Sequence, residues 1–420
     1  MEYGLIGEKL GHSFSKTIHE KLADYTYDLH PLAKEEVASF FEKKQFRAIN
    51  VTIPYKIAVM DYLDEIDDRA KAVGSVNTIV NRNHKLSGYN TDFGGFLYLL
   101  QHHNIEVKNK KVLVLGKGGA SKAIIAVLEF MQAKQVITVY YKESPNTVTY
   151  EVCQKLHSDA DVIINTTPVG MYPNLQDCPI DLEPYKNCKA VVDIIYNPIK
   201  TRLLLEAEKR NMIAVGGMEM LIAQAKYAVE IFLNTSIAEY QIDKIYKELL
   251  FEKKNVVLIG MPSSGKTTIG KEVAKVLQKD FVDIDEQIVL KIGMPISAYF
   301  EQFGEDAFRD VEQEVIKEFA GKNNLVISTG GGCIKREENM MYLSMNGVIL
   351  LIRRELSKLV IGEGRPLSSS TEALEKMYQQ RLPLYLLYSQ KTIENNTTTE
   401  YAVKQVQLVY TEMIEKNQKY

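Results

Sequence analysis

The 420-residue sequence contains no tryptophan and only four cysteines, at positions 153, 178, 188 and 333. These cysteines lie far apart without C-x-x-C spacing, so we predict reduced thiols rather than a zinc site or a disulfide framework. No uninterrupted apolar run approaches the roughly 18 residues that a membrane-spanning helix needs, and the start, MEYGLIGEKLGHS, lacks the layout of a secretory signal. We therefore expect a cytoplasmic protein with no membrane partner.

Neither sign of charge is in clear excess, because 51 Lys and Arg stand against 54 Asp and Glu, for a formal net charge of -3. A dedicated nucleic-acid binder usually shows a basic excess, so we expect no nucleic-acid partner. Hydrophobic residues make up 45% of the chain and charged residues 25%, as in soluble globular proteins. At roughly 150 residues per domain, the length predicts two or three domains.

Short β-branched apolar runs alternate with helical patterns, which is typical of an α/β fold with parallel sheets and crossover helices. A first series of such runs lies at 112–116, 136–140, 162–165 and 190–195, and a second at 255–260, 325–332 and 348–352. Between the two series, apolar spacing predicts helices from Met220 to Phe251. The polar FEKK at 251–254 is the predicted junction between domains.

Residues 260–267, GMPSSGKT, fit G-x-x-x-x-G-K-[ST] directly after a predicted strand and at the head of a helix. The backbone N–H groups of such a P-loop surround the phosphates, while Lys266 would reach the β- and γ-phosphates and the Thr267 hydroxyl would ligate Mg²⁺. The predicted ATP-binding residues are Gly260, Ser263, Ser264, Gly265, Lys266, Thr267 and Thr268.

Further motifs follow the P-loop in order: VDIDEQI with Asp283 and Asp285, GEDAFRDVE with Arg309, STGGG with Gly330, Gly331 and Gly332, GEGRPL with Arg365, and QQRLPLY with Arg381. The two aspartates lie two residues apart at the end of a predicted strand, and we expect two roles for them. This set resembles shikimate kinase over essentially all of 255–410.

The resemblance implies a P-loop kinase domain in which Asp283 joins Thr267 in the Mg²⁺ shell and Asp285 holds a hydroxyl of shikimate. Arg309 and Arg381 would pair with the substrate carboxylate, and the three glycines would let the backbone approach the ring. Lys266 and Arg365 would be catalytic, with Arg365 coming from a lid to stabilise the transferring phosphoryl group. The segment 348–365 is short for the lid of this family.

The segment LGKGGAS at 115–121 follows a predicted strand and precedes an apolar helix. Gly116, Gly118 and Gly119 fit a G-x-G-x-x-G turn, with Ser121 where the third glycine would stand. The pattern favours a dinucleotide-phosphate site, and a plain tight turn is the alternative.

Seven further motifs occur in the order found in shikimate dehydrogenase: GLIGEKLGHSFSKTIH at 4–19, NVTIPYK at 50–56, GSVNTIV at 74–80, YNTDFGGF at 89–96, INTTPVGM at 164–171, DIIYNP at 193–198 and GGMEMLIAQA at 216–225. The resemblance to that family spans residues 1 to about 248. It implies a substrate-binding domain and a Rossmann-like nucleotide-binding domain. One departure is Glu219, which lies beside the expected cofactor glycine turn.

The resemblance also implies roles at the matching positions. Lys56 and Asp92 would be the catalytic pair, since ketone reduction by hydride needs a proton for the developing alkoxide. The implied substrate-binding residues are Ser13 and Ser15 for the carboxylate, Thr52, Asn77 and Gln224 for the hydroxyls, and Tyr196 near the nicotinamide. The implied cofactor-binding residues are Gly116, Gly118, Gly119, Ala120, Ser121, Lys142, Asn165, Thr166 and Gly217. Taken singly, the serines could cap a helix and PYK could be a turn.

The choice of cofactor depends on the residues after the strand at 136–140. NADP-dependent members of this family place an Asn-Arg-Thr run there, whereas this chain has Tyr140-Tyr141-Lys142. No acidic residue ends the strand, as NAD use would favour. Lys142 could supply the positive charge for a 2′-phosphate, so we favour NADP and leave NAD open.

Together the two halves predict a bifunctional enzyme of aromatic amino-acid biosynthesis that reduces 3-dehydroshikimate with NADPH and phosphorylates shikimate with ATP and Mg²⁺. The expected domains are 1–92 plus 217–250 for substrate, 93–216 for NAD(P) and 255–420 for the kinase. Three alternatives stay open: quinate as the dehydrogenase substrate, a half that has become a non-catalytic module, and a kinase for another small alcohol. A homodimer is compatible with this prediction.

Overall fold

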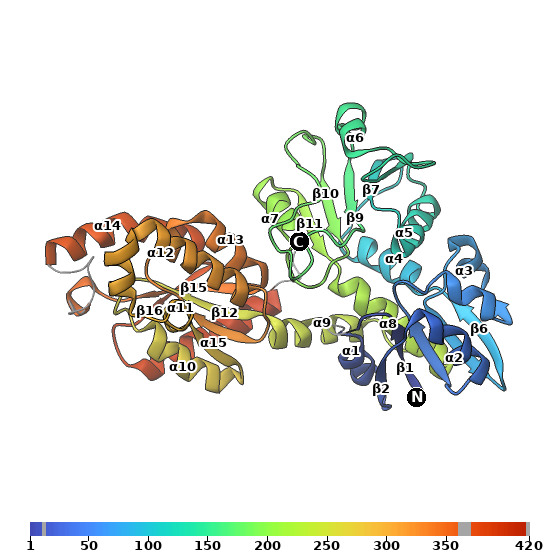
Figure 1. Cartoon of the computed structure of the whole chain (residues 1–420), viewed down its shortest axis with the longest axis horizontal. Coiled ribbons are helices and arrows are strands. Elements are labelled where there is room, and N and C mark those ends of the chain that lie inside the picture. Colours follow the sequence, from blue (N-terminus) through green and yellow to red (C-terminus); the bar gives the residue numbers. More distant parts are fainter. Residues whose placement is uncertain (11–13, 360–370, 417–420) are drawn as a thin grey trace. The chain divides into compact units, whose positions relative to one another are not determined.

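The computed structural model describes residues 1–10, 14–359 and 371–416. Its contacts divide the chain into two compact units, one of residues 1–171, 176–197 and 203–248, and the other of 172–175, 198–202 and 249–420. The first unit contains two β-sheets and the second unit contains one (Figure 1). The α/β fold predicted from the sequence is confirmed.

The first sheet has six strands in the order β2-β1-β3-β5-β6-β4 and is mixed, since β5 runs antiparallel to both of its neighbours. Its strands are β1 (Tyr3–Gly7), β2 (Tyr27–Pro31), β3 (Ala48–Val51), β4 (Glu65–Ile66), β5 (Thr78–Arg82) and β6 (Lys85–Tyr89), and its helices are α1 (Ser15–Leu22), α2 (Val37–Lys43) and α3 (Asp68–Val73). Side chains alternate between the faces. Ile49 and Ile79 join one buried cluster, whereas Ala48 and Val80 join another on the opposite face.

Helix α4 (Asp92–His102) follows this sheet and packs against α8 (Met218–Leu233). Two glycines allow the close approach, because a Cβ on Gly95 would lie 2.7 Å from the carbonyl oxygen of Met220 and one on Gly94 would lie 2.9 Å from the Tyr227 ring. Helix α8 also contacts α1, so the chain returns to the first sheet after completing the second.

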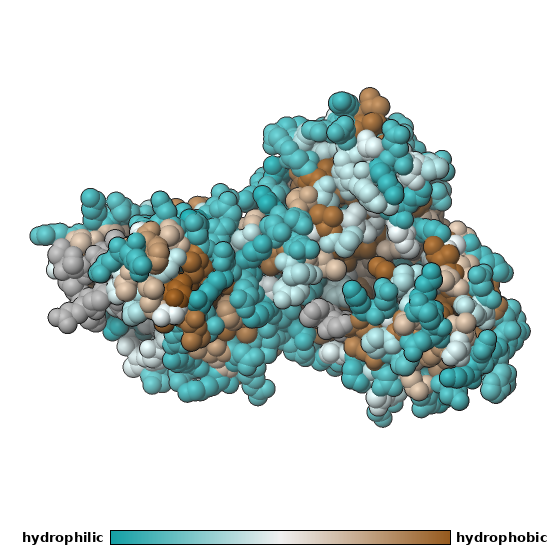
Figure 2. Space-filling view, in the orientation of Figure 1, coloured by the Kyte–Doolittle hydropathy of each residue, from teal (hydrophilic) through white to brown (hydrophobic). Residues whose placement is uncertain are grey.

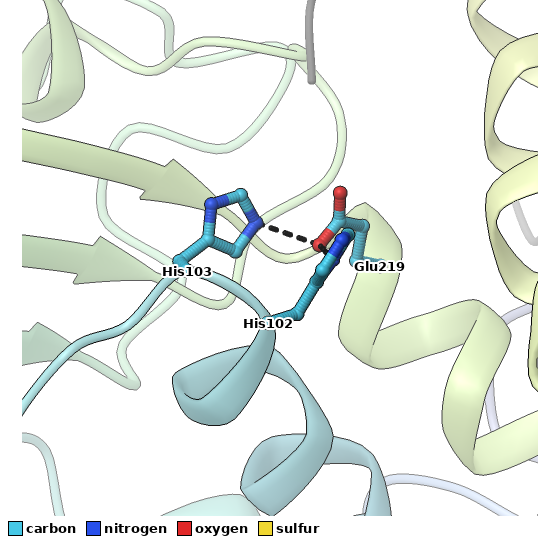
Figure 3. A group of neighbouring side chains, drawn as sticks. All are labelled: His102, His103 and Glu219. Carbon is cyan, nitrogen blue, oxygen red and sulfur yellow. Dashed lines mark hydrogen bonds and ion pairs between the residues drawn. The ribbon is translucent and has the colours of Figure 1, made fainter. Parts of the chain in front are cut away.

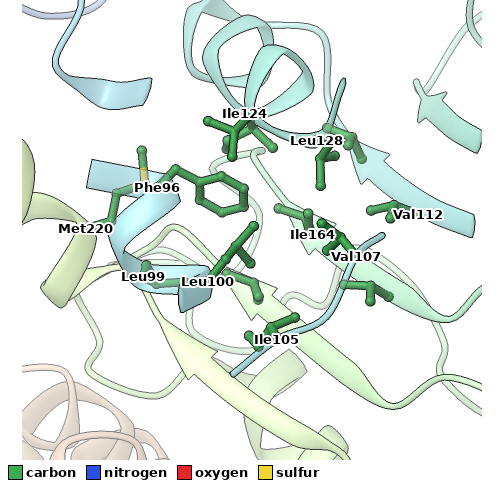
Figure 4. Packing of buried hydrophobic residues seen from close by; sticks show 14 of the residues in the cluster. Phe96, Leu99, Leu100, Ile105, Val107, Val112, Ile124, Leu128, Ile164 and Met220 are labelled. Atoms are coloured by element: carbon green, nitrogen blue, oxygen red, sulfur yellow. The ribbon is translucent and has the colours of Figure 1, made fainter. Parts of the chain in front are cut away.

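The second sheet has five parallel strands in the order β11-β10-β9-β7-β8. They are β7 (Lys111–Leu115), β8 (Gln135–Val139), β9 (Val162–Asn165), β10 (Ala190–Asp193) and β11 (Ile213–Gly216), with helices α5 (Gly119–Phe130), α6 (Tyr150–Leu156) and α7 (Arg202–Lys209). Val112 and Val114 pack toward α4 and α5 (Figure 4), whereas Leu113 and Leu115 pack on the opposite face with α6 and α7. Burial on both faces explains why the central strands β7, β9 and β10 are largely apolar in the sequence.

The third sheet forms the core of the second unit, with five parallel strands in the order β13-β14-β12-β15-β16. The strands are β12 (Asn255–Ile259), β13 (Asp280–Asp283), β14 (Leu325–Ser328), β15 (Gly347–Arg353) and β16 (Lys391–Glu394). Its helices are α10 (Lys266–Leu277), α11 (Ile284–Ile292), α12 (Ile296–Ala320), α13 (Glu337–Asn346), α14 (Thr371–Tyr388) and α15 (Thr399–Lys416), and α9 (Tyr240–Lys253) begins in the first unit and leads into β12. Helix α10 packs with α15, and α12 packs with α13 (Figure 1). The strands predicted in both series are confirmed, with small shifts at their ends.

The division between the two units falls between residues 248 and 249, next to the predicted junction FEKK, and α9 continues through it to Lys253. Its last carbonyl groups need partners that the helix itself cannot supply. The Lys279 ammonium donates hydrogen bonds to the carbonyl oxygens of Phe251, at 2.8 Å, and Glu252, at 3.1 Å. Burial lowers the pKa of Lys279 to about 8. The end of α9 is thus fixed to the second unit by a buried lysine.

The hydropathy of the surface agrees with the average charged and hydrophobic content of the chain. The face shown in Figure 2 is largely hydrophilic, with hydrophobic side chains in small groups. Within the described ranges, no helix combines the length and the apolar character needed to cross a membrane. The four cysteines form no disulfide in this structure.

Candidate active sites

A cavity of about 580 Å³ lies in the second unit, at the carboxyl ends of the parallel strands. Predicted residues that line it are Ser263, Gly265, Lys266, Thr267, Thr268, Asp283, Asp285, Arg309, Gly330, Gly331, Gly332 and Arg381. Predicted residue Arg365 lies outside the described residues. The cavity therefore brings together residues from the P-loop to α14.

The P-loop has the backbone that a phosphate cradle needs. Gly260 has φ 149°, Ser263 has φ 64° and Gly265 has φ 96°, all in the region that favours glycine. A Cβ on Gly260 would also lie 2.4 Å from the carbonyl oxygen of Ile352. The Lys266 ammonium donates to the carbonyl oxygens of Gly260 and Met261, each at 3.0 Å, so it lies folded across the loop.

Asp283 connects the P-loop to the next strand. It ends β13 and caps α11, with its Oδ1 accepting a hydrogen bond from the Asp285 backbone N–H at 3.0 Å. Its Oδ2 accepts one from the Thr267 hydroxyl at 2.7 Å. Two oxygen donors at the edge of the cavity fit Mg²⁺, which prefers carboxylate and hydroxyl oxygens.

The two aspartates lie in different elements. Asp285 lies in the first turn of α11 and not on an extended strand, because β13 ends at Asp283. Both side chains consequently line the same cavity. Alternation along a strand does not apply to this pair, although their contacts still differ.

The glycine run lies against two functional side chains. A Cβ on Gly330 would lie 2.7 Å from the Asp285 Oδ1, and one on Gly332 would lie 2.3 Å from the Arg309 Nη2. The carbonyl oxygen of Gly331 accepts a hydrogen bond from the Arg381 Nη1 at 3.0 Å. Larger residues would displace the groups that line the cavity.

In the first unit, four predicted residues form one hydrogen-bonded network. The Lys56 ammonium lies 2.5 Å from the Asp92 Oδ2, and the side chains are 14% and 9% exposed. The Asn77 amide donates to the Asp92 Oδ1 at 2.9 Å and to the Gln224 Oε1 at 3.4 Å. Asp92 is the first residue of α4, and Gln224 comes from α8. The close pairing of these helices therefore assembles the network.

Three other predicted substrate residues come from separate elements. Thr52 follows β3, and buried Ser15 is the first residue of α1. The Tyr196 ring lies 5.3 Å from that of Phe14, centroid to centroid, and burial raises the pKa of Tyr196. Predicted residue Ser13 lies outside the described residues.

The glycine-rich turn after β7 lies beside Lys56. Gly116 has φ 108°, and a Cβ there would lie 2.7 Å from the Thr166 Oγ1. Gly118 caps α5 and a Cβ on it would meet nothing within 4 Å, whereas one on Gly119 would lie 3.6 Å from the Lys56 Cδ. An open turn at a helix N-terminus fits a pyrophosphate, so the geometry suits a dinucleotide that reaches the lysine.

The other predicted cofactor residues surround this turn. Ala120 is half-buried in the first turn of α5, and the Ser121 hydroxyl donates to the Gly118 carbonyl oxygen at 2.7 Å. The fully buried Asn165 amide donates to the Asp193 Oδ1 at 3.0 Å. Ser121 and Asn165 therefore shape the loops themselves.

Two further positions lie at the edges of the same region. A Cβ on Gly217 would lie 2.0 Å from the Ile194 carbonyl oxygen, so only glycine fits there. Beyond β8, the exposed Lys142 places its ammonium over the Tyr141 ring, 5.4 Å from the centroid. A positive charge thus lies where the adenosine end of a dinucleotide would be recognised.

Comparisons with known proteins agree with both sites. The family model described as shikimate kinase matches residues 262–415, and the one described as shikimate dehydrogenase substrate binding domain matches residues 5–79. A shikimate dehydrogenase (NADP(+)) of Clostridium beijerinckii is 41% identical over 269 residues, covering 60% of this chain and 98% of the relative. The chain belongs to the shikimate dehydrogenase family. With the C-terminal match, it is a fusion of a shikimate dehydrogenase part and a shikimate kinase part.

Solved structures give the same result for the dehydrogenase part. A chorismate mutase/shikimate 5-dehydrogenase fusion protein from Clostridium acetobutylicum is 38% identical with a TM-score of 0.56, covering 59% of this chain and 96% of that one. Shikimate dehydrogenase 1 from Peptoclostridium difficile is 34% identical with a TM-score of 0.56, covering 59% of this chain and 98% of that one. Oxidoreductase and kinase parts thus share one chain.

Sequence reasoning missed a buried carboxylate in the kinase part. Arg309 is only 6% exposed, and its Nη1 donates to the Glu312 Oε2 at 2.6 Å. Burial raises the pKa of Glu312, and its Oε1 is buried with no hydrogen-bond partner among the described residues. Burial lowers the pKa of Arg309, but the neighbouring carboxylates of Glu312 and Glu305 raise it by more, so the pKa is raised overall. The i to i+3 spacing on one helix was the available sequence signal.

Arg354 also lines the cavity of the kinase part, although none of the recognised motifs contains it. A separate cavity of about 790 Å³ in the dehydrogenase part is lined by Arg69, Arg82, Tyr98 and Tyr227 among others. Within the described part of the chain, its lining includes none of the predicted site residues. This second cavity borders the Lys56–Asp92 network, because Thr91 lines it and is hydrogen-bonded to both Asn77 and Gln224.

Proposed function

We propose that this chain reduces 3-dehydroshikimate to shikimate with NADPH and then phosphorylates shikimate with ATP and Mg²⁺, giving shikimate 3-phosphate. The observation that carries the proposal is the presence of two separate sets of functional groups. One is the Lys56–Asp92 pair beside the turn at Gly119, and the other is the P-loop cavity with its arginines. The product of the first reaction is the substrate of the second.

In the dehydrogenase reaction, bound NADPH supplies a hydride to the ketone carbon. Lys56 would deliver a proton to the developing alkoxide, and Asp92 would orient the ammonium through their 2.5 Å contact. Asn77 holds the other oxygen of Asp92 and also contacts Gln224, so the substrate hydroxyls would meet an already ordered network. Thr52 would complete the hydroxyl contacts.

The remaining substrate contacts lie at the edge of the same site. Ser13 and Ser15 would bind the carboxylate, and Tyr196 would lie near the nicotinamide. The dinucleotide phosphates would face Gly118, Gly119 and Ala120 at the N-terminus of α5. Lys142 supports NADP over NAD, because its ammonium supplies the charge that a 2′-phosphate needs and no acidic residue ends β8.

In the kinase reaction, the P-loop and Lys266 would hold the ATP phosphates, while Thr267 and Asp283 would hold Mg²⁺. Asp285 would accept a hydrogen bond from the hydroxyl that attacks. Arg309 and Arg381 lie on the cavity wall and would pair with the carboxylate of shikimate. Arg365 would stabilise the charge of the transferring phosphoryl group.

We also propose three functional domains: residues 1–92 plus 217–250 for the substrate, 93–216 for the cofactor and 255–420 for the kinase. The three separate sheets support this division. The contact of α8 with α1 and α4 supports joining the segment after residue 217 to the first domain.

The test is one incubation of the purified chain with 3-dehydroshikimate, ATP and Mg²⁺, with NADPH, NADH or neither. Nicotinamide absorbance and shikimate 3-phosphate are followed together. We expect phosphorylated product only with a reduced cofactor, and faster formation with NADPH. Phosphorylation that occurs only when shikimate is added directly would contradict the dehydrogenase half, and reduction without phosphorylation would contradict the kinase half.

A further inference from the structure

Two histidines and one glutamate of the dehydrogenase part converge at the end of α4 that lies away from Asp92 (Figure 3). The Glu219 Oε2 lies 2.6 Å from the His103 Nε2 and 3.1 Å from the His102 Nδ1. One ligand atom from each residue lies within 4.8 Å of the others. The predicted catalytic and substrate-binding residues do not include any of the three.

The three side chains are held in place by the fold. Glu219 is only 4% exposed and lies in the first turn of α8, where the helix dipole favours a carboxylate. His102 ends α4 and His103 caps it, and their side chains are 29% and 21% exposed. A buried oxygen with two half-buried imidazoles leaves one side of the cluster accessible to a small ion.

A second carboxylate lies behind the His102 ring. The Asp243 Oδ1 lies 3.8 Å from the His102 Nε2 and accepts a hydrogen bond from the Tyr98 hydroxyl at 3.3 Å. A carboxylate behind one ring nitrogen favours the tautomer whose other nitrogen is free to bind a metal. Here the other nitrogen is Nδ1, the one that faces Glu219.

We propose that His102, His103 and Glu219 form a binding site for a divalent transition-metal ion of the zinc type. Two imidazole nitrogens and one carboxylate oxygen form a ligand set that zinc accepts, with solvent water as a fourth ligand. Mg²⁺ and Ca²⁺ prefer oxygen ligands, so they would not compete well here. Small movements of the three side chains would lengthen the present contacts between their ligand atoms enough for an ion to lie among them.

The position of this site gives the metal a structural role. Helix α4 leads from the first sheet to the second, and Glu219 lies where the chain returns from β11 into α8. The ion would therefore connect the two segments by which the chain passes between the sheets. Asp92 lies at the other end of α4, Gln224 follows Glu219 by five residues on α8, and Gly217 is only two residues from Glu219.

The test uses the full chain without an affinity tag, stripped of metal and kept in excess Mg²⁺ so that oxygen-ligand sites are filled. Zn²⁺ and Co²⁺ are titrated, with calorimetry for Zn²⁺, visible absorption for Co²⁺ and thermal unfolding for both. The variants are His102→Gln, His103→Gln and Glu219→Gln, and Asp243→Asn tests the outer carboxylate. His84→Asn is the matched control, because His84 is exposed and has φ 64°, which asparagine tolerates.

We expect one ion per chain, Co²⁺ bands of a low-symmetry nitrogen and oxygen site, and a higher Tm of the dehydrogenase part. Each ligand variant should weaken Zn²⁺ binding by more than about tenfold, Asp243→Asn by about tenfold, and His84→Asn should bind as the parent chain does. Failure of the parent chain to bind, or equal binding in the three ligand variants, would overturn the proposal. If those variants do not fold, absence of the Co²⁺ bands in the parent chain alone overturns it.

Discussion

Replacing Lys56 with methionine should separate the two activities of the chain. Methionine keeps most of the hydrocarbon stem that lies near Gly119, so the change removes chiefly the ammonium. The ammonium lies 2.5 Å from the Asp92 Oδ2, and Asp92 then retains its hydrogen bond from Asn77. We expect dehydrogenase kcat to fall and shikimate phosphorylation to stay unchanged.

The size of the loss follows from the role of the ammonium. A positioned proton donor contributes about 10²- to 10⁴-fold to the rate, which is about 3 to 5 kcal/mol of activation free energy. Stability should change less, by about 1 to 3 kcal/mol, because the carboxylate left behind is largely buried but keeps one partner. Activity should therefore be lost in protein that is still folded.

Initial rates of shikimate oxidation with NADP⁺ measure the first activity, and release of ADP with shikimate and ATP measures the second. Asp92→Asn and the double variant complete a double-mutant cycle. Because the pair acts as a unit, dehydrogenase turnover of the double variant should be no slower than that of the slower single variant. Lys134→Met, at an exposed lysine, is the control. A loss of less than about threefold in Lys56→Met, or an equal loss of phosphorylation, would refute the assignment.

Three further predictions concern the kinase part. Lys266→Ala should lower phosphorylation by at least about 10²-fold and leave dehydrogenase rates unchanged. Gly332→Ala should raise the KM for shikimate by about tenfold or more, with little change for ATP, because a Cβ would lie 2.3 Å from the Arg309 Nη2. Lys279→Met should remove a pH dependence that the parent chain shows in the thermal unfolding of its kinase part. The unfolding transition of this part is the one whose Tm rises when ADP and shikimate are added.

The sign of that pH dependence follows from the pKa of Lys279, which is about 8 in the folded chain against 10.5 for the free side chain. Between these values the unfolded chain binds more protons, so the free energy of unfolding of the parent rises with pH. We expect a rise on the order of 2 kcal/mol relative to Lys279→Met over this window. If the difference in unfolding free energy between the parent chain and Lys279→Met stayed the same across this pH range, that result would contradict the burial of a charged lysine.

For Lys266→Ala, near-normal turnover would contradict the P-loop assignment. For Gly332→Ala, an equal rise in the KM for ATP and for shikimate would place the effect on the whole domain instead of on Arg309. Direct binding of shikimate distinguishes these outcomes, since the arginine contributes to the binding of the substrate carboxylate in the proposed site.

Much of the fold was predictable because it depends on short-range patterns. Strands β7, β9 and β12 are continuously apolar since both faces are covered, and this pattern marks a buried parallel strand in any sequence. The P-loop was likewise predictable, because its glycines serve local backbone angles. The mixed first sheet was not predicted, since pairing depends on which strands meet and not on each strand alone.

The candidate sites show the same division. Motifs in order, through their resemblance to two families, indicated Lys56, Asp92, Asp285 and Arg381 without any geometry. The buried charge of Glu312 and the dual hydrogen bonding of Asp283 became visible only with the coordinates. The hydrogen bond from Thr267 to Asp283 joins α10 to β13, whereas Arg309 and Glu312 lie on one helix and are buried together because other elements cover that face.

The sequence by itself determined the elements and the chemistry that they carry: a P-loop before α10, a glycine turn before α5, and the order of two enzyme parts. Only the tertiary structure decided which distant groups meet. His102 and Glu219 are 117 residues apart, and they touch because α4 and α8 pack closely at Gly94 and Gly95. Local patterns specify local backbone, whereas contacts between distant side chains depend on how whole helices pack.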